Sequence, residues 1–76
     1  MIRELELVAL THDLPEYGLK AGDVGTVVLV HDRPGYEVEF MTCLGDTVAV
    51  VSVEPHEVRP IGPYEMQHAR PMEKRV

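Results

Sequence analysis

The sequence lacks tryptophan and has one cysteine, Cys43, so no disulfide can form within the chain. Long apolar runs are also missing: the longest have four residues, as at 27–30 and 48–51, whereas a membrane-spanning helix needs about 20. The N-terminus carries Arg3, Glu4 and Glu6 and no apolar stretch typical of a signal peptide. We therefore expect a cytoplasmic protein with no membrane span, in which Cys43 is an unreactive small side chain near a turn.

Basic residues are scarce. The chain has 7 Lys and Arg against 13 Asp and Glu, a formal net charge of −6, and residues 1–60 alone carry four cations against eleven carboxylates. Nucleic-acid binding is therefore disfavoured, because a phosphate backbone attracts clustered Lys and Arg and would repel this surface. The acidic surface is interpreted either as a means of staying soluble or as electrostatic steering toward a basic protein partner.

A chain of 76 residues forms one small domain with little interior in which to hide a catalytic site. The sequence has none of the common nucleophile, phosphate-binding or zinc-protease motifs. Glu37 and Glu39 would lie about 7 Å apart on one strand face, but an open face leaves such carboxylates solvated. The prediction is a noncatalytic protein with no catalytic residue and no cofactor.

Three of the four histidines precede a carboxylate, as His12-Asp13, His31-Asp32 and His56-Glu57. Folding could bring two such pairs together around a metal ion. However, adjacent residues on a strand point to opposite faces, and all three pairs stand at expected turns, where polar residues collect for local reasons. We therefore predict solvated turn residues and no metal site.

Strand patterns dominate the chain. Alternation and β-branched residues predict strands at 4–10, 25–30, 36–40, 47–53 and 58–60, with a single helical turn at 54–57. A long loop at 11–23 is expected to cover Leu14 and Leu19. The strand at 25–30 is apolar on both faces and is predicted to be the most buried.

The segment Tyr36-Glu37-Val38-Glu39-Phe40 alternates cleanly, so Tyr36, Val38 and Phe40 are predicted to face the core and the two glutamates to face water. Before it, Pro34 and Gly35 predict a type II turn, since Pro presets one φ and Gly accepts a positive φ at the next position.

These elements predict an all-β fold: a small five-stranded SH3-like barrel over residues 1–60, with a one-turn helix before the last strand and a flexible C-terminal tail over 61–76. Gly22 and Gly25 are expected to allow a sharp bend and close backbone approach, and Asp23 to bind backbone amides of its own turn. Gly22, Asp23, Gly25, Pro34 and Gly35 are thus assigned structural roles.

Several segments in order resemble the bacterial domain of unknown function 4926 family, whose mark is the Tyr-Glu-Val-Glu-Phe segment at 36–40. The others are Leu14-Pro15-Glu16, the stretch from Leu19 to Val28, and Gly45-x-Thr47-x-Ala49-Val50-Val51. The resemblance covers residues 5 to about 60. It implies an SH3-like barrel without an assigned activity, and a toxin-like or otherwise uncharacterised partner encoded nearby.

Two functions remain open. The first is a noncatalytic protein-interaction or assembly module, in one form an accessory or antitoxin-like partner of a neighbouring gene product. Its expected surface includes Tyr17, Glu37 and Glu39, and some valines of 27–30 and 48–51 should face outward and support a homodimer or a partner-binding patch. The alternative is a KOW-like nucleic-acid or ribosome-associated protein, because the Gly-Asp-x-Gly-x-Val element at 22–27 is similar to KOW-type barrels.

Overall fold

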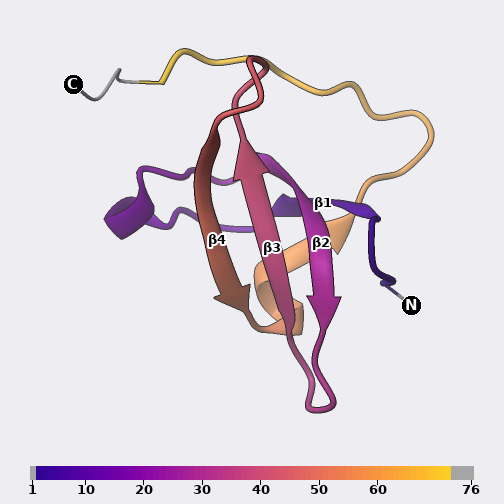
Figure 1. Cartoon of the computed structure of the whole chain (residues 1–76). Coiled ribbons are helices and arrows are strands. Elements are labelled where there is room, and N and C mark those ends of the chain that lie inside the picture. The colour runs from indigo at the N-terminus through magenta and orange to yellow at the C-terminus, as the bar shows by residue number, and fades with distance from the viewer. Residues whose placement is uncertain (1, 73–76) are drawn as a thin grey trace.

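A computed structural model describes residues 2–72, and its strands form one antiparallel sheet in the order β4-β3-β2-β1-β5 (Figure 1). The all-β prediction, the five strands and the single helical turn before the last strand are confirmed. The elements, in chain order, are β1 (Leu7–Leu10), η1 (Pro15–Tyr17), β2 (Val24–Val30), β3 (Tyr36–Met41), β4 (Thr47–Val53), η2 (Pro55–Glu57) and β5 (Val58–Pro60), where η denotes a 3-10 helix.

The sheet does not close, so the predicted closed barrel is wrong. Within the described residues β4 and β5 are its two edges and pair only with β3 and β1, respectively. β5 has three residues and ends in Pro60, which has no N–H to donate to a further strand. Figure 1 shows that β1 and β5 run in a different direction from β2, β3 and β4, so the sheet bends strongly without joining its edges.

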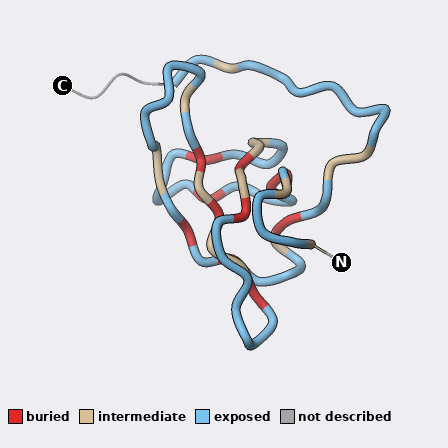
Figure 2. The backbone as a smooth tube through the Cα atoms, turned by 45° about the vertical axis from the view of Figure 1, so that its right-hand side comes forward, coloured by how far each residue is buried: buried red, intermediate tan, exposed pale blue. Residues whose placement is uncertain are grey.

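The core lies inside this bend (Figure 2). Val38 is fully buried and Phe40 is 2% exposed, while Tyr36 packs against the core from its margin, as the alternation predicted. Leu14 and Leu19 are also buried, as predicted, and the Leu14 amide donates to the Leu19 carbonyl at 2.9 Å. The buried core residues are Val8, Leu10, Leu14, Leu19, Val27, Val38, Phe40, Val51, Val53 and Val58.

The prediction that 25–30 is the most buried strand is wrong for its second half. Gly25 and Val27 are buried, but Val28, Leu29 and Val30 are 39%, 45% and 38% exposed. The pairing of β2 with β3 shifts register between Val27 and Leu29, and this irregularity turns the rest of β2 away from the core. The related prediction that part of this apolar run faces outward is confirmed.

The first strand begins later than predicted. Leu5 lies in a turn with φ of 70° and is 79% exposed, and Leu7, the first residue of β1, is 44% exposed. The carboxylate-leucine alternation at 4–7 therefore does not mark the core face. Val8 and Leu10 fill that role instead, because Val8 pairs with the buried Gly25 across the sheet.

The chain joins β2 to β3 through a five-residue loop, and the predicted type II turn is wrong. The His31 amide donates to the Gly35 carbonyl at 3.1 Å, which closes the loop around Asp32, Arg33 and Pro34. Gly35 has φ of 149°, a value that favours glycine but lies far from the roughly +80° of a type II turn.

After β5, residues 61–72 run back past the β3–β4 hairpin (Figure 1). Arg59 pairs with Glu65 at 2.7 Å near the start of this segment, and hydrogen bonds from Arg59 and from the Gly62 amide lower the pKa of Glu65 to about 2. We call residues 61–72 the strap. The predicted flexible tail also includes residues 73–76, which lie outside the described residues. No helix in the described part is long and apolar enough to cross a membrane.

Candidate functional site

The register of the sheet gathers polar and apolar residues on the side facing away from the core. Leu7 pairs with Thr26, Thr26 with Glu39, and Glu39 with Val50, while a second row joins Leu29, Glu37 and Ser52. Cross-strand partners project from the same face of a sheet. We define the outer sheet face by these seven residues: Leu7, Thr26, Leu29, Glu37, Glu39, Val50 and Ser52.

Side-chain hydrogen bonds hold both glutamates of this face. The Glu37 carboxylate accepts from the Ser52 hydroxyl and from His31 Nε2, the latter at 2.6 Å. The Thr47 hydroxyl donates to Glu39 at 2.8 Å. The Ser52 bond, followed by the His31 bond, lowers the pKa of Glu37, so that this group carries its negative charge at neutral pH. The face therefore presents two oriented carboxylates.

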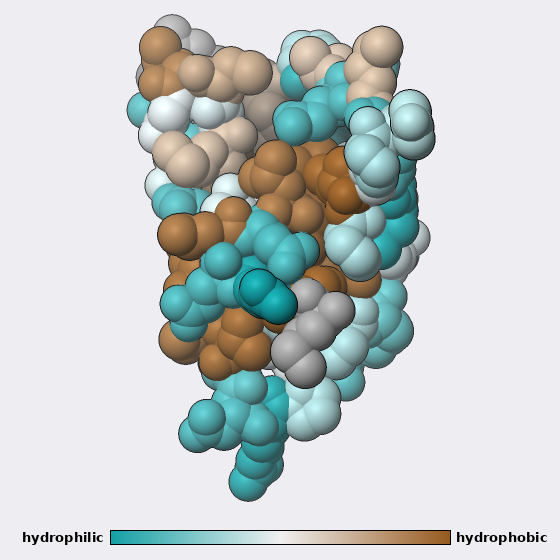
Figure 3. Space-filling model, turned by 90° about the vertical axis from the view of Figure 1, so that its right-hand side faces the viewer, coloured by the Kyte–Doolittle hydropathy of each residue, from teal (hydrophilic) through white to brown (hydrophobic). Residues whose placement is uncertain are grey.

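Exposed apolar side chains stand beside these carboxylates. Val50 is 52% exposed and Leu29 is 45% exposed, whereas Val30, which is 38% exposed, pairs with Tyr36 and therefore projects to the opposite face of the sheet. Figure 3 views the side of the molecule at the right of Figure 1, away from β4, and apolar and polar regions alternate there. Leu29 on β2 and Val50 on β4 lie on either side of the glutamates of β3, so this face combines exposed apolar side chains with acidic ones, as an interaction surface does.

The predicted partner surface is divided in the structure. Glu37 and Glu39 lie together on the outer sheet face, whereas Tyr17 is the last residue of η1, in the connection from β1 to β2. The sequence reasoning missed the hydroxyl and imidazole partners of the glutamates, because pairs such as Ser52 with Glu37 follow from strand register. Period-2 alternation indicates which side of a strand a residue occupies, but not its neighbour across the sheet.

The predicted turn residues surround the entry into β2. Gly22 has φ of 91°, and Asp23 accepts a hydrogen bond from the Lys20 amide at 2.8 Å. A Cβ on Gly25 would lie 2.6 Å from Val38 Cγ1 and 2.9 Å from the Phe40 ring, so β2 and the core side chains of β3 approach closely there. Pro34 and Gly35 occupy the β2–β3 loop described above.

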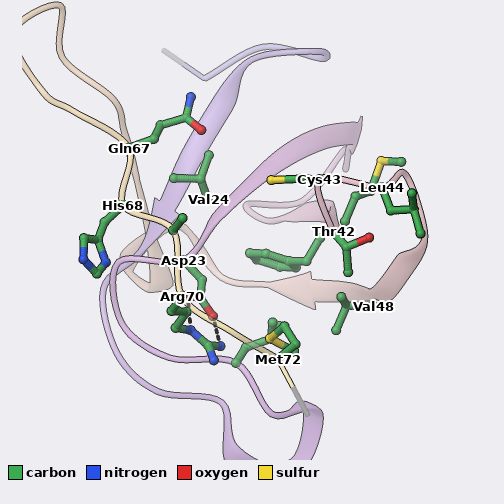
Figure 4. A pocket seen from close by; sticks show the side chains of 14 residues that line it. Asp23, Val24, Thr42, Cys43, Leu44, Val48, Gln67, His68, Arg70 and Met72 are labelled. Atoms are coloured by element: carbon green, nitrogen blue, oxygen red, sulfur yellow. Dashed lines mark hydrogen bonds and ion pairs between the residues drawn. The ribbon is translucent and has the colours of Figure 1, made fainter. Parts of the chain in front are cut away.

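A hollow of about 490 Å³ lies between the strap and the β3–β4 hairpin (Figure 4). Its lining includes the apolar Leu19, Phe40 and Val48. At one side of the hollow Arg70 donates two hydrogen bonds to the Asp23 carboxylate, from Nε to Oδ1 at 2.8 Å and from Nη2 to Oδ2 at 2.5 Å. Arg70 also donates to the Gly18 carbonyl. In the described residues every buried side-chain polar atom has a hydrogen-bond partner.

The Asp23–Arg70 pair alters the ionisation of both groups. Burial by itself raises the pKa of Asp23, but hydrogen bonds from Arg70 and the Lys20 amide and the positive charges of both side chains lower it overall, below 3.8. The hydrogen bond to Asp23 raises the pKa of Arg70. The pair is therefore charged near neutral pH and fastens the strap to the loop before β2.

Two of the four histidines, His12 and His31, bind carboxylates other than the one that follows them in the chain. His12 Nε2 lies 2.9 Å from Glu57 and His31 Nε2 lies 2.6 Å from Glu37, so neither is paired with the carboxylate that follows it in the chain. Between residues 2 and 72 no group of three His, Cys, Asp or Glu side chains is placed to hold a metal ion. Cys43 is exposed in the β3–β4 connection.

The fold and these sites define a small antiparallel all-β domain with an acidic and apolar outer sheet face. The chain belongs to the family described as Domain of unknown function (DUF4926), whose family model matches residues 4–60. That range holds all five strands and both 3-10 helices and ends at the start of the strap. Neither the curated proteins nor the solved structures contain a match to the chain.

Proposed function

We propose that the protein is a noncatalytic protein-interaction module that binds a partner protein through the outer sheet face. The observation that carries this proposal is the exposure of Leu29 and Val50 beside two glutamates already held by hydrogen bonds. Burying such apolar surface favours association by roughly 25 cal/mol per Å². The oriented carboxylates favour one orientation of a partner with complementary charge. Because Glu37 and Glu39 are held before a partner arrives, less side-chain entropy is lost on binding.

The charge of the face supports a basic partner. None of its seven residues is a cation, and two are carboxylates. A phosphate backbone or the same face of a second copy would meet like charge, whereas Lys and Arg of a partner would be attracted. An accessory or antitoxin-like role beside a neighbouring gene product is the form of this function that we favour, in the cytoplasm.

We further propose that the sheet is an open form of an SH3-like barrel. The support is the combination of five short strands, the long connection between β1 and β2, the single helical turn before β5 and the strong bend of the sheet. In this arrangement the bend buries one core and leaves the convex side, which carries the outer sheet face, available to a partner.

The proposal is tested by affinity capture from native lysate with the full chain, in parallel with and without nuclease. We expect a stoichiometric protein partner that is retained after nuclease treatment and at moderate salt. The double variant Leu29→Gln/Val50→Thr should lose it, because the apolar contact is removed from positions that are already about half exposed. Tyr64→Gln/Met66→Gln is the matched control, since both residues are almost fully exposed and lie on the strap.

Three results would contradict the proposal. Recovery that depends on RNA or DNA would support the KOW-like alternative. A partner retained equally by both double variants would place the interaction on another surface. Sedimentation as a stable homodimer that fails to form in Leu29→Gln/Val50→Thr would replace the partner protein with a second copy.

A further inference from the structure

One edge of the sheet is long and lacks charged residues and proline, and its only irregularity in the pairing with β3 is at Val48, near its start. β4 has seven residues, Thr47–Val53, without a proline or a charged residue, and within residues 2–72 it pairs with β3 only. Natural proteins usually protect such edges with charges, proline or short strands, because free backbone N–H and C=O groups invite another strand. The opposite edge shows that protection: β5 has three residues and ends in Pro60.

The charges around β4 limit what can pair with it. Exposed carboxylates stand at both of its ends, Asp46 immediately before the strand and Glu54 immediately after it. At about 3.4 Å per residue these two positions are roughly 27 Å apart along an extended chain. Glu37 and Glu39 on the neighbouring β3 add negative charge on the outer side.

A second copy of the chain is a poor occupant of this edge. A two-fold symmetric pair of β4 strands must be antiparallel, and when centred on Val50 it places Asp46 of one copy opposite Glu54 of the other, at both ends of the pairing. Like charges directly opposite each other across strands are destabilising. An apolar segment with cations at its ends meets favourable charge at both ends of β4 in either direction.

We propose that β4 is a docking edge for an extended segment of a partner protein, in which about seven uncharged residues of strand-forming type are flanked on both sides by Lys or Arg. The segment joins the sheet as a sixth strand through backbone hydrogen bonds to β4, and its outward side chains continue the apolar surface around Val50. This inference rests on the proposed function, since it names the kind of partner segment that the interaction module takes.

The test uses the full chain and a labelled synthetic probe, Lys-Lys-Thr-Val-Thr-Ile-Thr-Val-Thr-Lys-Lys. Fluorescence anisotropy at low salt should give binding at least tenfold tighter than that of the same peptide with glutamates in place of lysines. Replacing the central backbone N–H groups by N-methyl should abolish binding. Hydrogen exchange should slow at amides of Thr47–Val53 on addition of the probe, while exchange in β1 and β5 stays unchanged.

Protein variants test the flanking charges. Asp46→Asn/Glu54→Gln should weaken the lysine-flanked probe by about two- to tenfold, because it removes two exposed ion pairs and keeps the side-chain acceptor with which residue 54 caps η2. Glu4→Gln/Glu16→Gln makes the same change in net charge at exposed positions that do not flank β4 in the sequence, and it should leave binding unchanged.

The edge proposal is overturned if lysine- and glutamate-flanked probes bind alike, if the N-methylated probe still binds, or if the lysine-flanked probe does not bind at millimolar concentration. It is also overturned if the two double variants weaken binding equally. Capture of a partner protein through the outer sheet face together with any of these results would leave the interaction module standing and remove only the edge as its binding mode.

Discussion

At the scale of single residues, Leu5 has a backbone conformation that is unfavourable for its side chain. It occupies a turn between Arg3 and Glu6 with φ of 70°, a left-handed conformation in which a leucine side chain is strained. Its side chain is 79% exposed, so burial contributes little free energy to offset this strain. The Leu5 amide donates to the Val27 carbonyl at 2.6 Å, and this contact keeps the turn against β2.

Replacing Leu5 by Asn should therefore stabilise the protein by about 0.5–1 kcal/mol, because Asn tolerates the left-handed region more easily. Leu7→Asn is the matched control: Leu7 is also exposed but lies in the extended β1, where Asn is disfavoured and should destabilise. Urea unfolding of both variants and the parent measures the difference. Equal losses of stability would show that the turn at Leu5 carries no strain.

At the scale of elements, the approach of β2 to β3 depends on one glycine. A Cβ at Gly25 would fall within 3 Å of both Val38 and Phe40, two of the most buried side chains. The same strand leaves the core after Val27, so β2 is closely packed at its start and exposed at its end. The absence of a side chain at Gly25 therefore allows the β2 backbone to lie directly against Val38 and Phe40.

Gly25→Ala should destabilise the protein by about 1–3 kcal/mol, as expected when a methyl group is forced into a packed core. Gly62→Ala on the strap should cost much less, because the contact there is with the flexible side chain of Glu65. Thermal and chemical denaturation of the two variants provide the comparison. A loss for Gly25→Ala no larger than that for Gly62→Ala would mean that β3 moves aside without cost.

At the scale of the whole molecule, the Asp23–Arg70 pair joins parts of the chain 47 residues apart. It connects the strap, which lies outside the family match, to the loop that leads into β2. Both side chains are less than one third exposed, 25% for Arg70 and 18% for Asp23, so the pair is only partly screened by water. The strap is thereby held over the apolar lining of the hollow.

Arg70→Gln should lower the free energy of unfolding by about 1–2 kcal/mol at pH 7, the usual range for a partly buried hydrogen-bonded charge. Because the pKa of Asp23 is lower in the folded than in the unfolded chain, this stabilisation is complete above pH 3.8 and is lost as the pH falls through the folded pKa. The parent and the variant should therefore converge in acid. Chemical denaturation at pH 7 and pH 2.5 measures this, and an equal difference at both pH values would contradict it.

The core and the elements of this domain could largely be predicted from the sequence. Tyr36, Val38 and Phe40 alternate with charged residues, and Leu14 and Leu19 are isolated apolar residues in a polar loop, so local pattern alone indicated their burial. The run 27–30 could not be assigned a face, since it is apolar on both sides and its direction depends on an irregularity in the pairing with β3. The left-handed turn at Leu5 likewise gives no local signal.

The sequence by itself determined the all-β class, the number of strands, the helical turn before β5 and the negative charge, because these depend on composition and on short-range periodicity. Tertiary structure alone decided that the sheet stays open at β4, that Ser52 and His31 hold Glu37, and that Arg70 reaches Asp23. Each of these joins different elements through strand register or chain path. Such contacts are decided by the packing of the whole domain, which short-range pattern does not encode.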